Sequence, residues 1–488
     1  MDNRGDNISI KKNVIMNVLL AMSSFVVPLI TFPYTSRILH PVGTGRIAFM
    51  MSFMEYFNMI ALLGIPTYGI KACAKVREDK EELSRVVHEL LMISLIMAVL
   101  VYVVLAAFFL CVPRLAAEKE LFVIFATTVL LNAIGMEWLY QGLEQYSYIT
   151  VRSLIFKLIG IVAMFALVKE EKDYIIYGAI MIFAASASNV LNFFHSGKYV
   201  HKRWLGHYNP TKHLGGIMLL FTMACATKVY TNLDSVMLGF MTTDTDVGYY
   251  NASVKIKAIL VSMITALGAV LLPRSSYYLE NGREDEFEKI SAKALKWVIF
   301  IGLPVSVFFM IFAKEGILFL SGSLYEASIL PMQIMMPTVL FIGITNVLGI
   351  QMLIPMNKEK TVLKSVIIGA VLDFIINILL IGRLRSVGAA IGTLAAELAV
   401  LIYQYLNLKD RIKRMLSGYR ALNNVIAILI AVICAVWVKR LDMPPFFALV
   451  IEAVCFFTVY ALFMYLRKDE IITELIGDVK DKLKGIKR

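Results

Sequence analysis

The stretch LGGIMLLFTMACATKVYTNLDSVMLGFM (residues 214–241) reads as a membrane-spanning helix that carries two charges. It is long enough to cross a bilayer, which needs about 20 predominantly apolar residues. Lys228 and Asp234 interrupt the run, although each charge costs roughly 2.5–3.5 kcal/mol at the centre of a membrane helix. Ionisable side chains at this depth usually face a helix-bundle interior or a water-filled cavity. The stretch therefore predicts a membrane protein with a polar interior.

The composition of the whole chain indicates the same class. Its 488 residues are 59% hydrophobic and 17% charged, with a mean hydropathy of +0.73, whereas soluble domains have about 45–50% apolar and about 25% charged residues. The net charge of +12 fits loops that face an anionic leaflet, because no basic stripe carries interleaved aromatic residues. The cysteines and histidines show no metal-binding spacing. We expect an integral membrane protein with no metal, no cofactor and no nucleic-acid partner.

Fourteen apolar runs are predicted to cross the membrane. With a cytoplasmic N-terminus, the predicted inside segments hold 32 basic residues and the outside loops hold 11. This asymmetry is the positive-inside pattern and predicts that both termini are cytoplasmic. The predicted spans are residues 14–36, 46–68, 86–112, 120–141, 149–168, 174–195, 214–241, 247–272, 295–313, 330–355, 362–382, 387–408, 421–438 and 445–466.

Two similar passages, at the first and seventh runs, indicate an internal repeat. PYTSRILHPVGTGRIAFMMSF (33–53) and VYTNLDSVMLGFMTTDTDVGYYNASVKI (229–256) each contain Tyr-Thr, then a charge, then Val-Gly opening the next run. Six spans separate them, so the repeat is parallel, with six spans in each half and two appended. The predicted divisions are an N-terminal lobe (1–212), a C-terminal lobe (213–410), two appended spans (411–466) and a basic cytoplasmic tail (467–488).

Four stretches carry a resemblance to a known family: LITFPYTSRIL (29–39), GMEWLYQGLEQYSYITVRSLIFK (135–157), YTNLDSVMLG (230–239) and VGYYNASVKI (247–256). With the pattern of twelve plus two spans, the chain resembles the Wzx-type O-antigen and polysaccharide flippases. These belong to the multidrug/oligosaccharidyl-lipid/polysaccharide exporter superfamily, which also holds the lipid II flippase MurJ and the MATE drug exporters. The resemblance covers nearly the whole chain.

The resemblance implies an all-α membrane fold of about 14 transmembrane helices, with two six-helix lobes in a V around a central cavity and two further C-terminal helices. It implies a bacterial plasma-membrane protein that flips an undecaprenyl-diphosphate-linked oligosaccharide to the outer leaflet by alternating access. Its implied partners are that glycan, membrane lipids, a polysaccharide polymerase and other assembly proteins. Arg37 matches an arginine that is taken to hold the lipid diphosphate in MurJ-like relatives.

The charges at membrane depth are the candidate cavity residues, because cationic donors in a cleft can offset the lost hydration of a diphosphate. Lys228 and Asn232 are four residues apart and share one helix face. For Asp234, a buried ion pair with Lys255 or Lys257, a cavity charge, a coupling carboxylate and a snorkelling side chain all stay open. The full set is Arg37, Lys157, Lys228, Asn232, Asp234, Lys255 and Lys257.

Three carboxylates are candidates for coupling to a proton or a sodium ion: Asp234, Asp373 and Glu397. The alternative for Asp373 and Glu397 is that they join helices through polar contacts. Pro28 and Pro33 lie in the first span, where proline removes a backbone donor and bends a helix. They are candidates for a hinge or for a static kink, and we favour the hinge.

Two other functions compete with the flippase. A cation-coupled multidrug antiporter would share the fold, although the cavity cations argue against cationic cargo. A membrane-embedded polymerase would need a catalytic loop at the membrane surface, and no sizeable outside loop is predicted. We therefore expect a transporter and not an enzyme.

Overall fold

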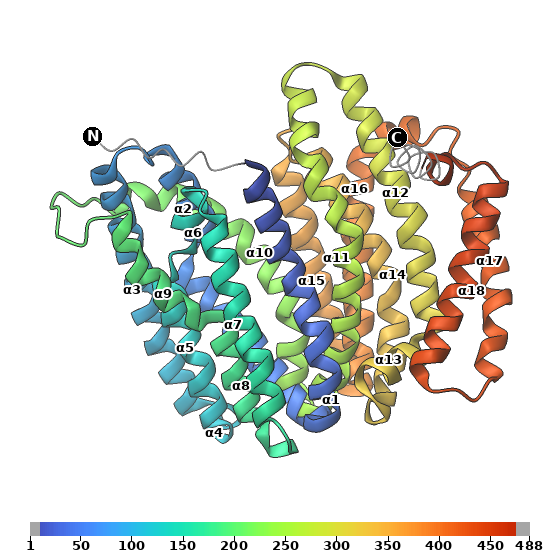
Figure 1. Ribbon diagram of the computed structural model, residues 1–488, viewed down its shortest axis with the longest axis horizontal. Helices are drawn as coiled ribbons and strands as arrows, with labels where there is room; N and C mark the ends of the chain where they lie inside the picture. The colour runs from blue at the N-terminus through green and yellow to red at the C-terminus, as the bar shows by residue number, and fades with distance from the viewer. Residues whose placement is uncertain (1–9, 475–488) are drawn as a thin grey trace, which may run out of the picture. The chain divides into compact units, whose positions relative to one another are not determined.

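The structure, a computed structural model, describes residues 10–474, which are helical almost throughout and contain no strand (Figure 1). The α-helices are α1 (Ile10–Leu62), α2 (Ile65–Lys75), α3 (Lys80–Cys111), α4 (Pro113–Ala117), α5 (Lys119–Gly135), α6 (Glu137–Gly142), α7 (Tyr146–Leu167), α8 (Tyr174–Ile182), α9 (Ser188–His195), α10 (Thr211–Met241), α11 (Asp244–Glu280), α12 (Glu284–Ile311), α13 (Ala313–Ser321), α14 (Ile329–Thr345), α15 (Glu359–Leu384), α16 (Ser386–Met415), α17 (Ala421–Val436) and α18 (Pro445–Leu466). Short 3₁₀ or π segments lie between them: η1 (Glu171–Asp173), η2 (Phe183–Ala187), η3 (Ser196–Lys198), η4 (Ser323–Ser328), η5 (Asn346–Leu353) and η6 (Trp437–Arg440).

Twelve helical segments of the described chain are long and apolar enough to cross a membrane, so the predicted count of fourteen is not confirmed. Two differences account for the gap. The first two predicted spans merge in one segment, Val26–Lys75, and the eighth lies in α11, which is not among the twelve. The 53 residues of α1 form two helical arms that meet at His40, about 45 Å and about 33 Å long at 1.5 Å per residue, so each arm alone can cross the roughly 30 Å hydrocarbon core.

α1 is divided by one break, at His40. His40 has φ 55° and ψ 178°, and it is the one residue of α1 with non-helical dihedrals. Pro28 and Pro33 lie inside the helical part that precedes the break. The chain reverses direction at the break, as the blue ribbon shows (Figure 1). The hinge role of the two prolines stays a prediction, because a hinge is defined by two conformations.

By contacts the chain forms two units, residues 1–248 and 249–488. α10 and the first turn of α11 belong to the first unit, in which α1 packs against α3, α5, α7, α8 and α10. The predicted lobe boundary at residues 212/213 stays a prediction. It rests on the order of the spans along the chain, whereas the boundary at residue 248 groups residues that contact each other.

The second unit is built on α16, which packs against α14 and α15. The appended helices α17 and α18 form an antiparallel pair, shown in red in Figure 1, which packs against α12 and α13 through a cluster of phenylalanines. The start of the predicted tail docks on α12, where Lys296 pairs with Glu470 at 2.7 Å and Lys293 pairs with Glu474 at 2.5 Å. Residues 475–488 of the tail lie outside the described residues.

Candidate functional site: a charged cluster at the bend of α1

The break in α1 places a short polar passage at one end of the first unit. The left-handed φ of His40 is costly for a residue with a Cβ. Two contacts hold it: His40 Nδ1 lies 3.3 Å from Glu171 Oε2, and Thr44 Oγ1 donates to the His40 carbonyl at 3.0 Å. Pro41 then begins the second arm of α1, where its missing N–H leaves no helical hydrogen bond unmade.

The second arm touches the start of α11 backbone to backbone. A Cβ on Gly45 would lie 1.8 Å from the Asp244 carbonyl oxygen, and a Cβ on Gly248 would lie 2.0 Å from the Pro41 carbonyl oxygen. Only glycine fits at either position, because no side-chain carbon approaches another atom so closely. The two Val-Gly passages that the sequence pairs as a repeat therefore lie directly against each other.

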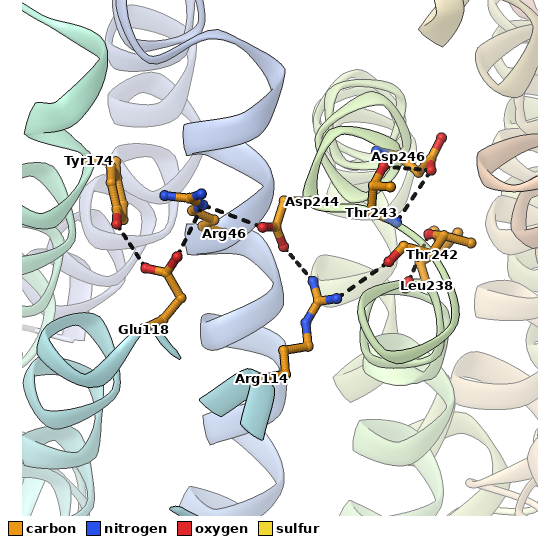
Figure 2. A network of polar contacts seen from close by, with 9 residues as sticks. All are labelled: Arg46, Arg114, Glu118, Tyr174, Leu238, Thr242, Thr243, Asp244 and Asp246. Atoms are coloured by element: carbon orange, nitrogen blue, oxygen red, sulfur yellow. Dashed lines mark hydrogen bonds and ion pairs between the residues drawn. The ribbon is translucent and has the colours of Figure 1, made fainter. Parts of the chain in front are cut away.

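A cluster of opposite charges surrounds this contact, and we call it the bend cluster (Figure 2). Asp244 accepts from Arg46 Nε at 3.3 Å and, on its other oxygen, from Arg114. Arg46 also contacts Glu118 Oε1 at 3.2 Å, and Tyr174 donates to Glu118 Oε2 at 2.8 Å. Two arginines and two carboxylates thus balance each other, and the side chains of these four residues are 21–31% exposed.

The local structure of the α10–α11 connection presents Asp244 to the arginines. Thr243 caps α11 and exchanges hydrogen bonds with Asp246, whose carboxylate accepts from the Thr243 hydroxyl at 2.7 Å. Arg114 donates to the Thr242 carbonyl at 3.4 Å, which closes the end of α10. These hydrogen bonds fix the local backbone, and Asp244, in the first turn of α11, points back to α1 (Figure 2).

An aromatic layer lies one helical turn further along α1. Phe49 packs edge-on against Phe240 with ring centroids 5.2 Å apart, and Arg114 lies over the Phe49 ring at 4.6 Å. Phe53 contacts Phe240 and Phe108 in the same way. The bend cluster therefore covers an apolar contact between α1, α3 and α10.

The predicted cavity residues of the first unit fall on three helices. Lys228 of α10 pairs with Glu55 of α1 at 2.5 Å, and this pair joins the two helices. Asn232, also on α10, donates to the Lys228 carbonyl at 3.0 Å. Lys157 of α7 donates to Ser23 of α1 at 2.7 Å. Arg37 is exposed, and its guanidinium donates to the Pro33 carbonyl at 2.5 Å. Their roles in binding cargo stay predictions.

The remaining candidates are buried or half-buried. Asp234 is 5% exposed and belongs to the first unit, whereas Lys255 and Lys257 belong to the second, so their pairing stays a prediction. On α15, Asn377 donates to Asp373 Oδ1 at 3.3 Å, and both side chains lie against Gly392 of α16. Glu397 is 7% exposed on α16. Ion coupling by Asp234, Asp373 and Glu397 stays a prediction.

Sequence reasoning missed the bend cluster. It counted Arg46 and Arg114 only as outside-loop charges that fix topology. The available signal was the Val-Gly repeat, because Arg46 and Asp244 stand beside its two copies. No pattern in the sequence showed the pairing itself. Arg46 and Arg114 lie 198 and 130 positions from Asp244 in the chain.

The fold is that of a known class of membrane transporters. The lipid II flippase MurJ, in an inward closed conformation, matches with a TM-score of 0.71 and 16% identity, over 94% of this chain and all of that chain. An inward-facing multidrug resistance MATE transporter matches with a TM-score of 0.64 and 16% identity, over 83% of this chain and 99% of that one. The expectation of an all-α membrane fold of the MurJ and MATE type is confirmed.

Within this class, the sequence gives the family. The model of the polysaccharide biosynthesis protein family matches residues 10–279, more than half of the chain, and the chain belongs to that family. A relative from Escherichia coli K12, named "Putative O-antigen transporter", is 26% identical over 400 residues, which cover 81% of this chain and 95% of the relative. The resemblance to the Wzx-type flippases is confirmed.

Proposed function

We propose that this protein flips a lipid-linked oligosaccharide, with an undecaprenyl-diphosphate carrier, from the cytoplasmic to the outer leaflet of the bacterial plasma membrane by alternating access. The observation that carries the proposal is that one chain combines two matches: the polysaccharide biosynthesis family in sequence and the MurJ fold over 94% of its length. The relative named as an O-antigen transporter adds support over most of both chains. The product would feed surface polysaccharide assembly.

The proposed orientation follows from the excess of basic residues in alternate loops, which favours cytoplasmic termini. In that orientation the bend of α1, the stretch from α4 to α5, η1 and the α10–α11 connection are all outer segments. The bend cluster joins these segments, because Arg46 follows the bend, Arg114 and Glu118 lie in the stretch from α4 to α5, and Tyr174 and Asp244 are the first residues of α8 and α11. We infer that the cluster is a latch that holds α1, the start of α5 and the start of α11 together at the outer end of the first unit while cargo enters from the cytoplasm.

The charges of the first unit suit an anionic cargo. Arg37, Lys157 and Lys228 lie on α1, α7 and α10, and lysine and arginine bind phosphate oxygens through charge-assisted hydrogen bonds. The Lys228–Glu55 pair lowers the cost of holding a cation at membrane depth. Arriving diphosphate would compete with Glu55 for Lys228, so the pair could open as cargo binds.

A multidrug antiporter is the second candidate, because the MATE fold also matches. The family match and the named relative favour the glycan cargo over a drug. A transport function of either kind places the chemistry in binding and release, without a covalent step.

The test is a flipping assay in a strain that lacks its own flippase for a defined lipid-linked repeat unit. Spheroplasts would be treated with a membrane-impermeant reagent that modifies only glycans on the outer leaflet. Expression of this protein should make the repeat unit accessible, and the polymerase is left out of the strain so that the flipped unit is not consumed. Unchanged accessibility with several repeat-unit structures, together with resistance to cationic dyes, would favour the antiporter instead.

A further inference from the structure

The segment that connects α9 to α10 is fastened onto α3. Residues 199–210, which we call the connecting strap, form the green loop at the left of the first unit (Figure 1). The His201 amide donates to Ser84 Oγ at 2.8 Å, and the Asn209 amide donates to Glu89 Oε1 at 2.7 Å. Tyr208 and His88 share a hydrogen bond of 2.8 Å. The strap is therefore held at both ends by one face of α3.

Between these anchors, the tip of the strap overhangs a groove against α3. The groove has a volume of about 220 Å³. The lining has a cationic and aromatic side from the strap, formed by Lys202, Arg203, Trp204 and Tyr208. The α3 side is apolar apart from His88 and is formed by Leu91, Met92 and Leu95.

The apolar wall of the groove continues into the lipid-facing side of α3. Ile96, Val99 and Val103 are 61%, 61% and 64% exposed, so they form an apolar stripe that needs hydrocarbon around it. Trp204 is 74% exposed beside the groove. An indole in that position suits the membrane–water interface, where Trp places an apolar ring and a polar N–H together.

We propose that this groove is a binding site for an anionic phospholipid of the leaflet that the strap faces. Its phosphate would lie on Lys202 and Arg203, and the first carbons of an acyl chain would lie on Leu91, Met92 and Leu95. Arginine and lysine supply the charge-assisted donors that a phosphate needs, and basic pockets at the cytoplasmic side are suited to anionic headgroups.

The place of the groove distinguishes this lipid from the cargo. The groove lies under the strap on the lipid-facing side of α3, and its lining includes none of the candidate cargo residues Arg37, Lys157 and Lys228. The proposed site therefore stands apart from cargo binding, and it would anchor the strap, and with it the start of α10, to the membrane surface.

The experiment uses the full chain in nanodiscs of phosphatidylcholine that contain increasing amounts of phosphatidylglycerol with brominated acyl chains. Bromine quenches nearby indoles, and the difference in emission between the wild type and Trp204→Phe isolates the signal of Trp204. Brominated phosphatidylcholine in the same amounts gives the non-specific baseline. We expect half-maximal quenching of Trp204 at a low fraction of phosphatidylglycerol.

The double variant Lys202→Gln/Arg203→Gln should raise that half-maximal fraction by roughly 10- to 30-fold, since each basic side chain near an anionic surface contributes about 1 kcal/mol. The matched control is Lys71→Gln/Lys75→Gln, which removes the same charge from exposed positions of α2 outside the groove and should change little. Equal shifts in both double variants would overturn the proposal, because only a general field would then act. So would equal quenching by both lipids, or selective quenching by a brominated polyprenyl phosphate alone.

Discussion

Removing the charge of Asp244 tests whether the bend cluster keeps the outer end closed. Asp244→Asn keeps the size of the side chain and loses the charge that both arginines share. The side chains of Asp244, Arg46 and Arg114 are 27%, 31% and 27% exposed. Their pairs therefore lie between exposed pairs, worth about 0.2–1 kcal/mol, and buried pairs, which cost about 3–5 kcal/mol to break. About 1 kcal/mol for each pair gives a loss of about 2 kcal/mol, or roughly 30-fold in the closed-to-open ratio.

The assay measures how often the end opens. Val247 is fully buried beside the close contact between α1 and α11, so Val247→Cys would place a thiol that reacts only when this contact separates. In a chain whose five native cysteines are replaced, a membrane-impermeant maleimide added outside should label this thiol roughly 10- to 30-fold faster with Asp244→Asn than without it.

Glu144→Gln is the matched control. It removes one carboxylate from the Arg77–Glu144 pair, which is 3.0 Å long and joins other connections of the same unit, and it should leave labelling unchanged. If Asp244→Asn labels at the parental rate while the protein stays folded, the cluster does not hold this end closed and the latch is refuted. Equal acceleration by Glu144→Gln would refute it too, since the effect would then reflect general loosening.

Three further substitutions test packing and burial by thermal unfolding in detergent. Gly248→Ala should lower the free energy of unfolding by about 1–3 kcal/mol, because the added methyl would meet the Pro41 carbonyl. The control is Gly215→Ala, where a Cβ would meet no described atom within 4 Å, and it should be neutral or stabilise the protein by up to about 1 kcal/mol. Equal effects of the two substitutions would contradict the close contact at Gly248. Glu452→Met should stabilise by about 1–3 kcal/mol, because neither carboxylate oxygen of this fully buried side chain has a hydrogen-bond partner among the described residues. A lower unfolding temperature would point to an ionic partner. Glu89→Ala should lower the free energy of unfolding by about 3–5 kcal/mol, because the buried carboxylate accepts hydrogen bonds from Lys212, His213 and the Asn209 amide. The control is Glu81→Ala at an exposed position, which should change the free energy of unfolding by less than about 1 kcal/mol.

The helices were predictable because a membrane span is a local feature. Its length and hydropathy are set by the residues within it, so the predicted runs fall on helices of the structure. The count differed at two places. The segment Val26–Lys75 holds two predicted spans, whose helical arms meet at the kink of His40, and α11 is not among the twelve segments.

The site was less predictable because its contacts are not local. Lys228 and Glu55 are each visible in the sequence as charges at membrane depth, yet their pairing joins positions 173 residues apart. Arg46 and Arg114 looked like ordinary loop charges, since loops at membrane surfaces carry many. The repeat of Val-Gly passages came closest, because it marked both strips of backbone that meet at Gly45 and Gly248.

The chemistry of the bend cluster suits a contact that opens in every transport cycle, as the proposed latch requires. A purely apolar closure would expose hydrophobic surface to water on opening, at about 25 cal/mol for each Å². Partly exposed ion pairs exchange protein partners for water and lose only about 1 kcal/mol each. Arginine adds direction, because its planar fork fixes the approach of Asp244 and Glu118. The Phe49–Phe240 contact then supplies packing between α1 and α10. In the proposed latch, the ion pairs align the start of α11 with α1 and add a small free energy of closure that cargo binding can overcome.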